Sequence, residues 1–380
     1  MINIFQPSLG NEELSEIKKV FDSNWIGRGD YVNEFERLFA KNLNEQKENF
    51  YALSCCTEGL FLAAKVFNFQ KGDEVIVPSI SFIAAASAVT SSGASLVICD
   101  VDKYSLNATA DTIKDKITNK TKAIILNHYG GHPCDMDPIM KLAKENNIFV
   151  IEDSACAVSS FYKGKACGTI GDMGIWSFDA MKSIVTGDGG MIYCKSEENL
   201  NIIKEECYLG LPPRSSSGLD NANNQTDIWW EVQINRPGRR SIMNNISGAI
   251  GVVQMRRLKD FLERRKEIYE MYNESLKDLD WLITPPKLNK ESTNSYYFYW
   301  IQTEKRNELA LFLKENGVYS TYRYWPINEV DYFDKKDTVN LPNTNYANSR
   351  TLNIPLHTSL LNSDVQKIID LILEFGSNTS

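Results

Sequence analysis

A single lysine, Lys182, lies in a polar, glycine-rich connection between two short apolar runs. Residues 174–178 and 190–194 have the length and composition of β-strands, so we predict a loop between them that carries the lysine. Ser177 precedes it, and the glycines of segment 187–190 allow backbone to come close to a bulky group. Such a lysine suits Schiff-base chemistry, which requires desolvation or a neighbouring cation to lower the pKa of its amine. The competing interpretation is a solvated surface lysine, the commoner fate of this residue type.

Three further residues stand where predicted strands end or helices begin. Asp153 follows the apolar run 148–151, and ligands of α/β sheets bind at the carboxyl ends of strands, so it is either a site residue or a helix cap. Phe82 has a comparable place after the strand at 74–77, with core packing as its alternative. Thr57 ends a turn at 54–57 before a helix, where it can hold a phosphate or cap the helix.

Strands alternate with helices along most of the chain. We predict strands at 50–53, 74–77, 95–101, 123–128 and 148–152, and helices at 11–23, 31–42, 58–67, 80–91, 110–116, 136–146 and 197–210. This alternation predicts a mainly parallel, doubly wound α/β sheet. A long helix at 245–272 precedes a strand at 296–303 and helices at 307–316 and 363–375. We therefore divide the chain into an N-terminal arm with a large domain (1–250) and a linking helix with a small C-terminal α+β domain (251–380).

Composition narrows the class of protein. With 380 residues and 43% hydrophobic content, the chain can bury the cores of two domains. The net charge of −8 argues against a nucleic-acid partner. No stretch is apolar enough to span a membrane and the N-terminus lacks the pattern of a secretory signal, so we expect a cytoplasmic protein with reduced cysteines. The cysteines lack metal-ligand spacing, so we expect no metal site.

A series of motifs resembles the DegT/DnrJ/StrS family of pyridoxal-phosphate-dependent sugar aminotransferases, which have the aspartate-aminotransferase (type I) fold. The similarity covers nearly the whole chain. Each motif is weak alone, and their common order and spacing carry the resemblance. The motifs are residues 29–36, 72–78, 128–137, 151–157, 171–174, 177–178 with Lys182, 187–190 and 352–356.

The resemblance implies roles for individual residues around pyridoxal 5'-phosphate. Lys182 is similar to the family lysine that forms the Schiff base and then moves a proton between the amino-bearing carbon and the cofactor. Asp153 is similar to the carboxylate that lies under the pyridine nitrogen. That ion pair keeps the nitrogen protonated, so that the ring can take up electrons. Phe82 resembles the aromatic residue on the ring, while Thr57 and Ser177 would hold the phosphate.

The chain departs from the family pattern at several positions. Cys55 and Cys56 replace the usual Ser-Gly of the phosphate turn, so that turn is made without glycine. Cys156 stands where a glutamine or histidine usually lies near the phenolic oxygen of the cofactor. Arg240 aligns with an asparagine that reaches the cofactor of the second subunit, with Asn244 close by. An arginine there can serve as a charge-assisted phosphate partner across a homodimer.

The implied reaction is a transamination in which an amino acid, L-glutamate or another, gives its nitrogen to a keto-sugar, usually a nucleotide-linked one. Stacking and phosphate pairing make Trp25, Arg28, Trp229, Arg323 and Tyr324 candidates for binding that substrate. Alternatives are a small phosphorylated ketone as acceptor, a sugar dehydratase, and a regulatory protein that binds the cofactor without chemistry. Lys182 argues against the dehydratases, which carry histidine at that position.

Overall fold

The computed structural model describes residues 1–211, 234, 236–333 and 340–379. Its sheet elements are β1 (Phe50–Leu53), β2 (Glu74–Pro78), β3 (Ser95–Cys99), β4 (Thr121–Asn127), β5 (Phe149–Asp153), β6 (Phe161–Tyr162), β7 (Lys165–Ala166), β8 (Met173–Ser177), β9 (Gly190–Cys194), β10 (Tyr299–Gln302) and β11 (Thr351–Ile354). Its α-helices are α1 (Asn11–Asp22), α2 (Asp30–Asn42), α3 (Cys56–Val66), α4 (Ile83–Ser91), α5 (Ala110–Lys114), α6 (Met136–Asn146), α7 (Glu197–Glu206), α9 (Asn245–Leu276), α10 (Arg306–Glu315), α11 (Pro342–Arg350) and α12 (Asn362–Thr379).

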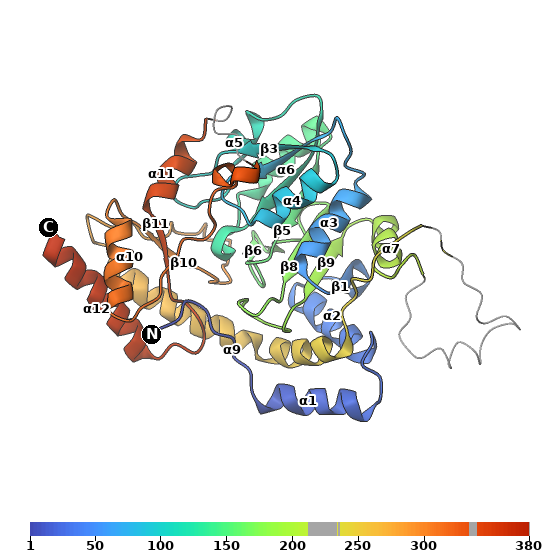
Figure 1. Ribbon diagram of the computed structural model, residues 1–380, viewed down its shortest axis with the longest axis horizontal. Helices are drawn as coiled ribbons and strands as arrows, with labels where there is room; N and C mark the ends of the chain where they lie inside the picture. Colours follow the sequence, from blue (N-terminus) through green and yellow to red (C-terminus); the bar gives the residue numbers. More distant parts are fainter. Residues whose placement is uncertain (212–233, 235, 334–339, 380) are drawn as a thin grey trace, which may run out of the picture.

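A seven-stranded sheet in the order β1-β9-β8-β5-β4-β2-β3 forms the centre of the molecule (Figure 1). The pairs among β8, β5, β4, β2 and β3 are parallel, whereas β9 runs antiparallel to both of its neighbours. This confirms the predicted mainly parallel α/β sheet. It also brings the carboxyl ends of β5 and β8 side by side, where Asp153 pairs with Ile175.

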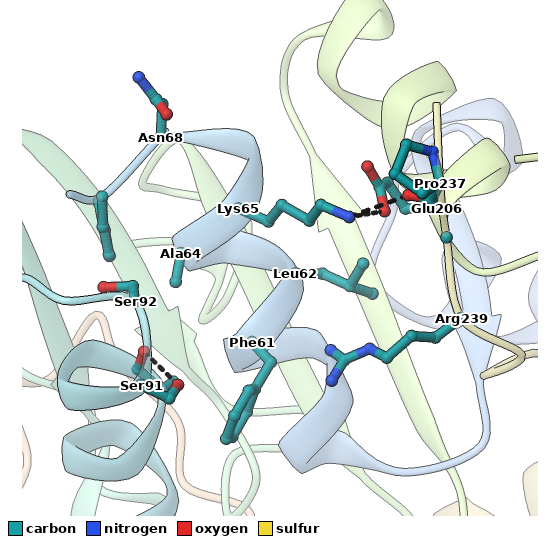
Figure 2. A pocket seen from close by; sticks show the side chains of 13 residues that line it. Phe61, Leu62, Ala64, Lys65, Asn68, Ser91, Ser92, Glu206, Pro237 and Arg239 are labelled. Atoms are coloured by element: carbon teal, nitrogen blue, oxygen red, sulfur yellow. Dashed lines mark hydrogen bonds and ion pairs between the residues drawn. The ribbon is translucent and has the colours of Figure 1, made fainter. Parts of the chain in front are cut away.

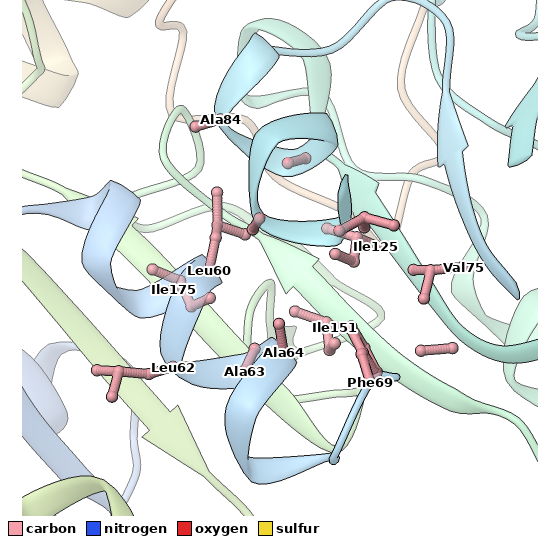
Figure 3. Packing of buried hydrophobic residues seen from close by; sticks show 14 of the residues in the cluster. Leu60, Leu62, Ala63, Ala64, Phe69, Val75, Ala84, Ile125, Ile151 and Ile175 are labelled. Atoms are coloured by element: carbon pink, nitrogen blue, oxygen red, sulfur yellow. The ribbon is translucent and has the colours of Figure 1, made fainter. Parts of the chain in front are cut away.

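Successive strand residues alternate between the buried cores on the two faces of the sheet, because side chains of a strand point to opposite faces. Ile151 and Ile175 belong to the core under α3 and α4, whereas Val150 and Trp176 belong to cores on the other face. Leu60, Ala63 and Ala64 of α3 lie over this sheet in Figure 3.

Helix α3 can lie close to the sheet because residue 59 is glycine. A Cβ atom there would lie 2.7 Å from Cγ2 of Ile175 on β8. The close approach fixes the N-terminal turn of α3, with Cys56 and Thr57, next to the end of β8.

The C-terminal part of the chain packs around the β10–β11 pair. Its core combines residues of these strands with α10, α12 and the second half of α9, and includes Tyr272, Tyr299 and Ile354. Helix α9 extends from this core to α1 and α2, and both pack against it (Figure 1). The division into domains at residue 250 stays a prediction.

Several predicted boundaries are wrong by a few residues. Helix α4 begins at Ile83 rather than at 80, so Phe82 is its N-cap, and β5 includes Asp153 as its last residue. The strand at 296–303 is shorter, because Tyr296 has a φ of 52° and only Tyr299–Gln302 pairs with β11. The hairpin of β6 and β7 and helix α11 were not predicted. Among the described helices, none has the length and apolar composition needed to cross a membrane.

Candidate active site

The ends of β5 and β8 and the first turn of α3 meet at a cavity of about 250 Å³. Eight of the sequence-predicted site residues line it: Cys56, Thr57, Phe82, Asp153, Ser177, Lys182, Arg323 and Tyr324. These residues come from distant parts of the chain. Their convergence makes this cavity the candidate active site.

Lys182 lies on the connection between β8 and β9. The backbone N–H of Lys182 donates a hydrogen bond to the carbonyl of Asp179 (2.9 Å), which closes a turn in this connection. Its Nζ atom lies 4.0 Å from Sγ of Cys156 and 4.8 Å from the ring centroid of Tyr297. Burial disfavours the ammonium form, but Cys156, Tyr297 and other neighbours outweigh this effect and raise the pKa of Lys182. The groups that face this amine are acceptors rather than cations, so they favour its protonated form.

Asp153 is buried, with 5% of its surface exposed, and its Oδ1 accepts a hydrogen bond from the N–H of Ala155 (3.1 Å). Burial raises the pKa of this carboxyl, although the hydrogen bond from Ala155 and the charge of Lys182 oppose the rise. Within the described residues no helix begins between β5 and α7, so Asp153 is not a helix cap. A desolvated carboxylate that lines a cavity is suited to a cationic partner placed there.

The turn before α3 is held close to β9. Cys55 is the N-cap of α3 and Thr57 lies inside the first turn, so the interpretation of Thr57 as a cap is wrong. Gly190 permits the close packing, because a Cβ atom there would lie 2.7 Å from the backbone of Cys55 and Cys56. The first N–H groups of a helix lack partners within the helix and attract anions. Together with Thr57 and Ser177, they form a cradle suited to a phosphate group.

An aromatic pair borders the cavity. The side chain of Phe82 is 45% exposed, which excludes the core-packing alternative, and its ring lies 5.6 Å from that of Tyr324. The Tyr324 hydroxyl is 3.3 Å from Sγ of Cys156. Cys156 itself lies behind the lining, where burial raises the pKa of its thiol.

The structure does not bring two of the predicted substrate residues to this cavity. Arg28 is 8% exposed, and its guanidinium forms an ion pair with Glu36 (2.6 Å) and stacks on Tyr51 (4.1 Å to the centroid). The indole N–H of Trp25 donates to the carbonyl of Arg28 (2.9 Å). Trp229 lies outside the described residues.

Arg240 and Asn244 are exposed and do not line the cavity of their own chain. Asn244 is the N-cap of α9 and accepts a hydrogen bond from the N–H of Ser247 (3.0 Å). The guanidinium of Arg240 lies 5.4 Å from the ring centroid of Tyr208. Within the described chain it forms no ion pair, which leaves it available to a partner.

Sequence reasoning missed Tyr297, which lines the cavity and contacts Lys182. It also missed the lining residues Asp179, Met181 and Asp188, which flank Lys182 in the same connection. Tyr297 comes just before β10, more than a hundred residues after Lys182, and no local motif marks it. For Asp179, Met181 and Asp188, the available signal was their proximity to Lys182 in the sequence.

A second cavity, of about 470 Å³, lies beside the outer surface of α3 (Figure 2). Figure 2 shows Lys65 extending to Glu206 and Pro237, while Arg239 extends toward Phe61. Arg239 also pairs with Glu58 (2.7 Å). Because Lys65 and Arg239 are paired with carboxylates and the described lining contains none of the residues predicted for the site, this cavity is not the candidate active site.

Comparison with known proteins places the chain among sugar-modifying enzymes. The sequence pattern of the DegT/DnrJ/EryC1/StrS aminotransferase family matches residues 7–373. The dTDP-4-dehydro-2,3,6-trideoxy-D-glucose 4-aminotransferase of Saccharopolyspora spinosa is 43% identical over 97% of this chain and 95% of its own length. The GDP-perosamine synthase of Escherichia coli O157:H7 is 34% identical over 99% of both chains.

Solved structures agree with these relatives. The aminotransferase TlmJ from Streptoalloteichus hindustanus is 42% identical, with a TM-score of 0.93 over 100% of both chains. A putative sugar aminotransferase from Streptococcus pneumoniae, in a PLP form, has a TM-score of 0.88 at 26% identity, over 99% of this chain and 98% of its own. The shared fold is that of pyridoxal-phosphate-dependent transferases, as expected from the sequence.

Proposed function

Because the chain belongs to the DegT/DnrJ/EryC1/StrS aminotransferase family, we propose that it transfers an amino group from L-glutamate to the ketone of a nucleotide-linked keto-sugar. The enzyme is an aminotransferase, and its cofactor is pyridoxal 5'-phosphate. The observation that carries the proposal is the cavity in which Lys182, Asp153, Thr57 and Ser177 meet. The name of the relative from Saccharopolyspora spinosa makes a dTDP-linked 4-keto-sugar the first acceptor to test.

The residues of the cavity fit this cofactor. When bound, pyridoxal 5'-phosphate supplies a ring that takes up the electron pair released as the C–H bond beside the transferred nitrogen breaks. The buried carboxylate of Asp153 would pair with the protonated pyridine nitrogen and keep the positive charge on it. The first turn of α3, with Thr57, and the hydroxyl of Ser177 would hold the phosphate, and Phe82 would cover the ring.

Lys182 would hold the cofactor covalently and then serve as the general acid and base. Each half of the reaction requires a proton to leave one carbon and reach another, and Nζ of Lys182 is a basic atom on a flexible side chain that lines the cavity. The charge of Asp153 raises the pKa of Lys182. Once this charge is paired with the pyridine nitrogen, it would no longer do so, and the neutral amine of Lys182 would be favoured.

Arg323 would bind the α-carboxylate of the amino donor. Its guanidinium contacts Sδ of Met181 (3.6 Å) and lies 5.3 Å from the ring centroid of Phe5, and it forms no ion pair with the described residues. Its backbone is anchored, since its N–H donates to Oδ1 of Asn353 (2.8 Å) and its carbonyl accepts from the hydroxyl of Tyr129. An α-carboxylate is attached to the carbon that carries the nitrogen, whereas the phosphate of a nucleotide-sugar is several bonds away from the ketone. A cation in the same cavity as Lys182 therefore suits the donor.

The exposed position of Arg240 supports a homodimer in which this residue enters the active site of the second subunit. Arg240 suits this role better than Asn244, since the side chain of Asn244 already caps α9. We further propose that the enzyme acts in the cytoplasm.

The first experiment is the absorption spectrum of the purified protein with pyridoxal 5'-phosphate, before and after addition of L-glutamate. We expect a yellow band that glutamate bleaches and a dTDP-linked 4-keto-sugar restores. A band that glutamate leaves unchanged would remove glutamate as donor. Absence of any band would refute the assignment of the site.

A further inference from the structure

The amine of Lys182 is held by a ring and a thiol rather than by a carboxylate. Nζ lies 4.8 Å from the centroid of Tyr297 and 4.0 Å from Sγ of Cys156, and it forms no ion pair with the described residues. An ammonium group is attracted to the face of an aromatic ring, and the attraction grows when water is excluded. A neutral amine lacks this attraction, so the two protonation states of Lys182 interact differently with Tyr297.

The ring of Tyr297 has a fixed position. It is 3% exposed and stacks on Phe5 with a centroid distance of 5.7 Å and an interplanar angle of 12°. Its backbone N–H donates to the carbonyl of Gly130 (3.0 Å). Arg265, which is fully buried, donates to the carbonyl of Tyr297 (3.4 Å). A ring held from several sides does not follow the lysine, so it can define a resting place for the amine.

We propose that Tyr297 is a positioning residue for Lys182, whose ring holds the ammonium form of the lysine whenever the lysine is not bound to the cofactor. The inference rests on the proposed Schiff-base role of Lys182. The ring would keep the proton-carrying amine inside the cavity between the two halves of the reaction. No hydroxyl is needed for this role, since the ring face makes the contact.

Other charged or titratable groups also face this pair. Those facing Lys182, apart from Tyr297 itself, are Cys156, Cys56 and Asp153, and those facing the Tyr297 ring include Arg265 and Arg323. None of them changes in a substitution of Tyr297, so a change in the behaviour of the amine reports on the ring itself.

The test compares Tyr297→Phe, which keeps the ring, with Tyr297→Leu, which removes it. The protein without cofactor is mixed with pyridoxal 5'-phosphate over a range of pH, and the rate of appearance of the yellow band is recorded. Borohydride trapping and peptide mass analysis identify the lysine that has reacted. Only the neutral amine reacts, and loss of the ring lowers its pKa. We expect Tyr297→Leu to displace the profile of this rate against pH by about one unit to lower pH. At a fixed pH below the midpoint of the profile, the rate should then be about tenfold higher than in the wild type. Tyr297→Phe should match the wild type.

Fluorinated phenylalanines at position 297 provide a second series that keeps the shape of the ring if the leucine variant does not fold. Stepwise fluorination weakens the attraction for a cation, and the profile should move stepwise in the same direction. An unchanged profile in the fluorinated series, or an equal shift for Tyr297→Phe and Tyr297→Leu, would overturn the proposal. If the trapped residue is not Lys182, the proposed function fails instead, so the two failures are distinguishable.

Discussion

Replacement of Asp153 by asparagine tests the centre of the proposed site. The substitution keeps the size of the side chain and its capacity to accept the hydrogen bond from Ala155, and it removes the charge. The carboxylate is 5% exposed, so little solvent screens its interaction with a cation in the cavity. An opposite charge at contact distance moves a pKa by about one to three units, which is about 1.4–4 kcal/mol.

This magnitude predicts that Asp153→Asn slows proton transfer by roughly 10- to 1,000-fold. Without the carboxylate, the pyridine nitrogen of the cofactor would no longer be kept protonated, and its ring would accept electrons less readily. The affinity for cofactor should fall less, since the phosphate cradle and Lys182 are intact. The assay is single-turnover bleaching of the yellow band by saturating glutamate, together with a separate titration of cofactor binding.

Asp188→Asn is the matched control. Asp188 lines the same cavity, and its Oδ1 accepts a hydrogen bond from the N–H of Gly189 (2.9 Å), but it has no role in the proposed reaction. We expect near-normal bleaching in this variant. Equal rates in Asp153→Asn and the wild type, or equal losses in both variants, would refute the reasoning.

Three other substitutions test the remaining roles. Lys182→Ala should lower transamination by at least about 10²- to 10⁴-fold while circular dichroism shows a folded protein, and turnover near that of the wild type would exclude Lys182 as the Schiff-base residue. Arg323→Gln should weaken glutamate by about 10- to 150-fold, the value of a charge-assisted hydrogen bond, and should leave the half-reaction with the keto-sugar unchanged; equal losses in both half-reactions would assign Arg323 elsewhere. Arg240→Ala should weaken cofactor binding by about tenfold, and an unchanged cofactor affinity would contradict the contact across the homodimer.

Local sequence patterns predicted most of the fold. Apolar runs predicted all seven strands of the central sheet, and helical periodicity predicted most of the helices, because burial of an element leaves such a pattern in the sequence. Boundaries were less accurate where capping decides them. Helix α4 begins after Phe82, and β5 extends to Asp153, and neither limit has a periodic signal.

Among the site residues, those in motifs near strand ends and two in the C-terminal part, Arg323 and Tyr324, were predicted from the sequence, whereas Tyr297 was not. Lys182, Asp153 and Thr57 belong to motifs with a recognisable order. Arg28 has the residue type of a phosphate ligand, yet its ion pair with Glu36 buries it away from the cavity. Whether Arg28 binds a phosphate or an internal carboxylate depends on Glu36, which lies eight positions away on the next helix, and the residue type alone does not reveal this partner.

The sequence by itself predicted the class of the sheet, and it identified Lys182, Asp153 and the resemblance to the family. The class of the sheet follows from local periodicity, whereas the two residues and the family follow from the order and spacing of the motifs. Only the tertiary structure decided which atoms surround the amine. Tyr297 contacts Lys182, and Arg323 lines the same cavity, because loops of the C-terminal part pack onto the end of the sheet. Such contacts depend on how separate elements fit together in space, and the free energy of that packing is not encoded in any short stretch of the chain.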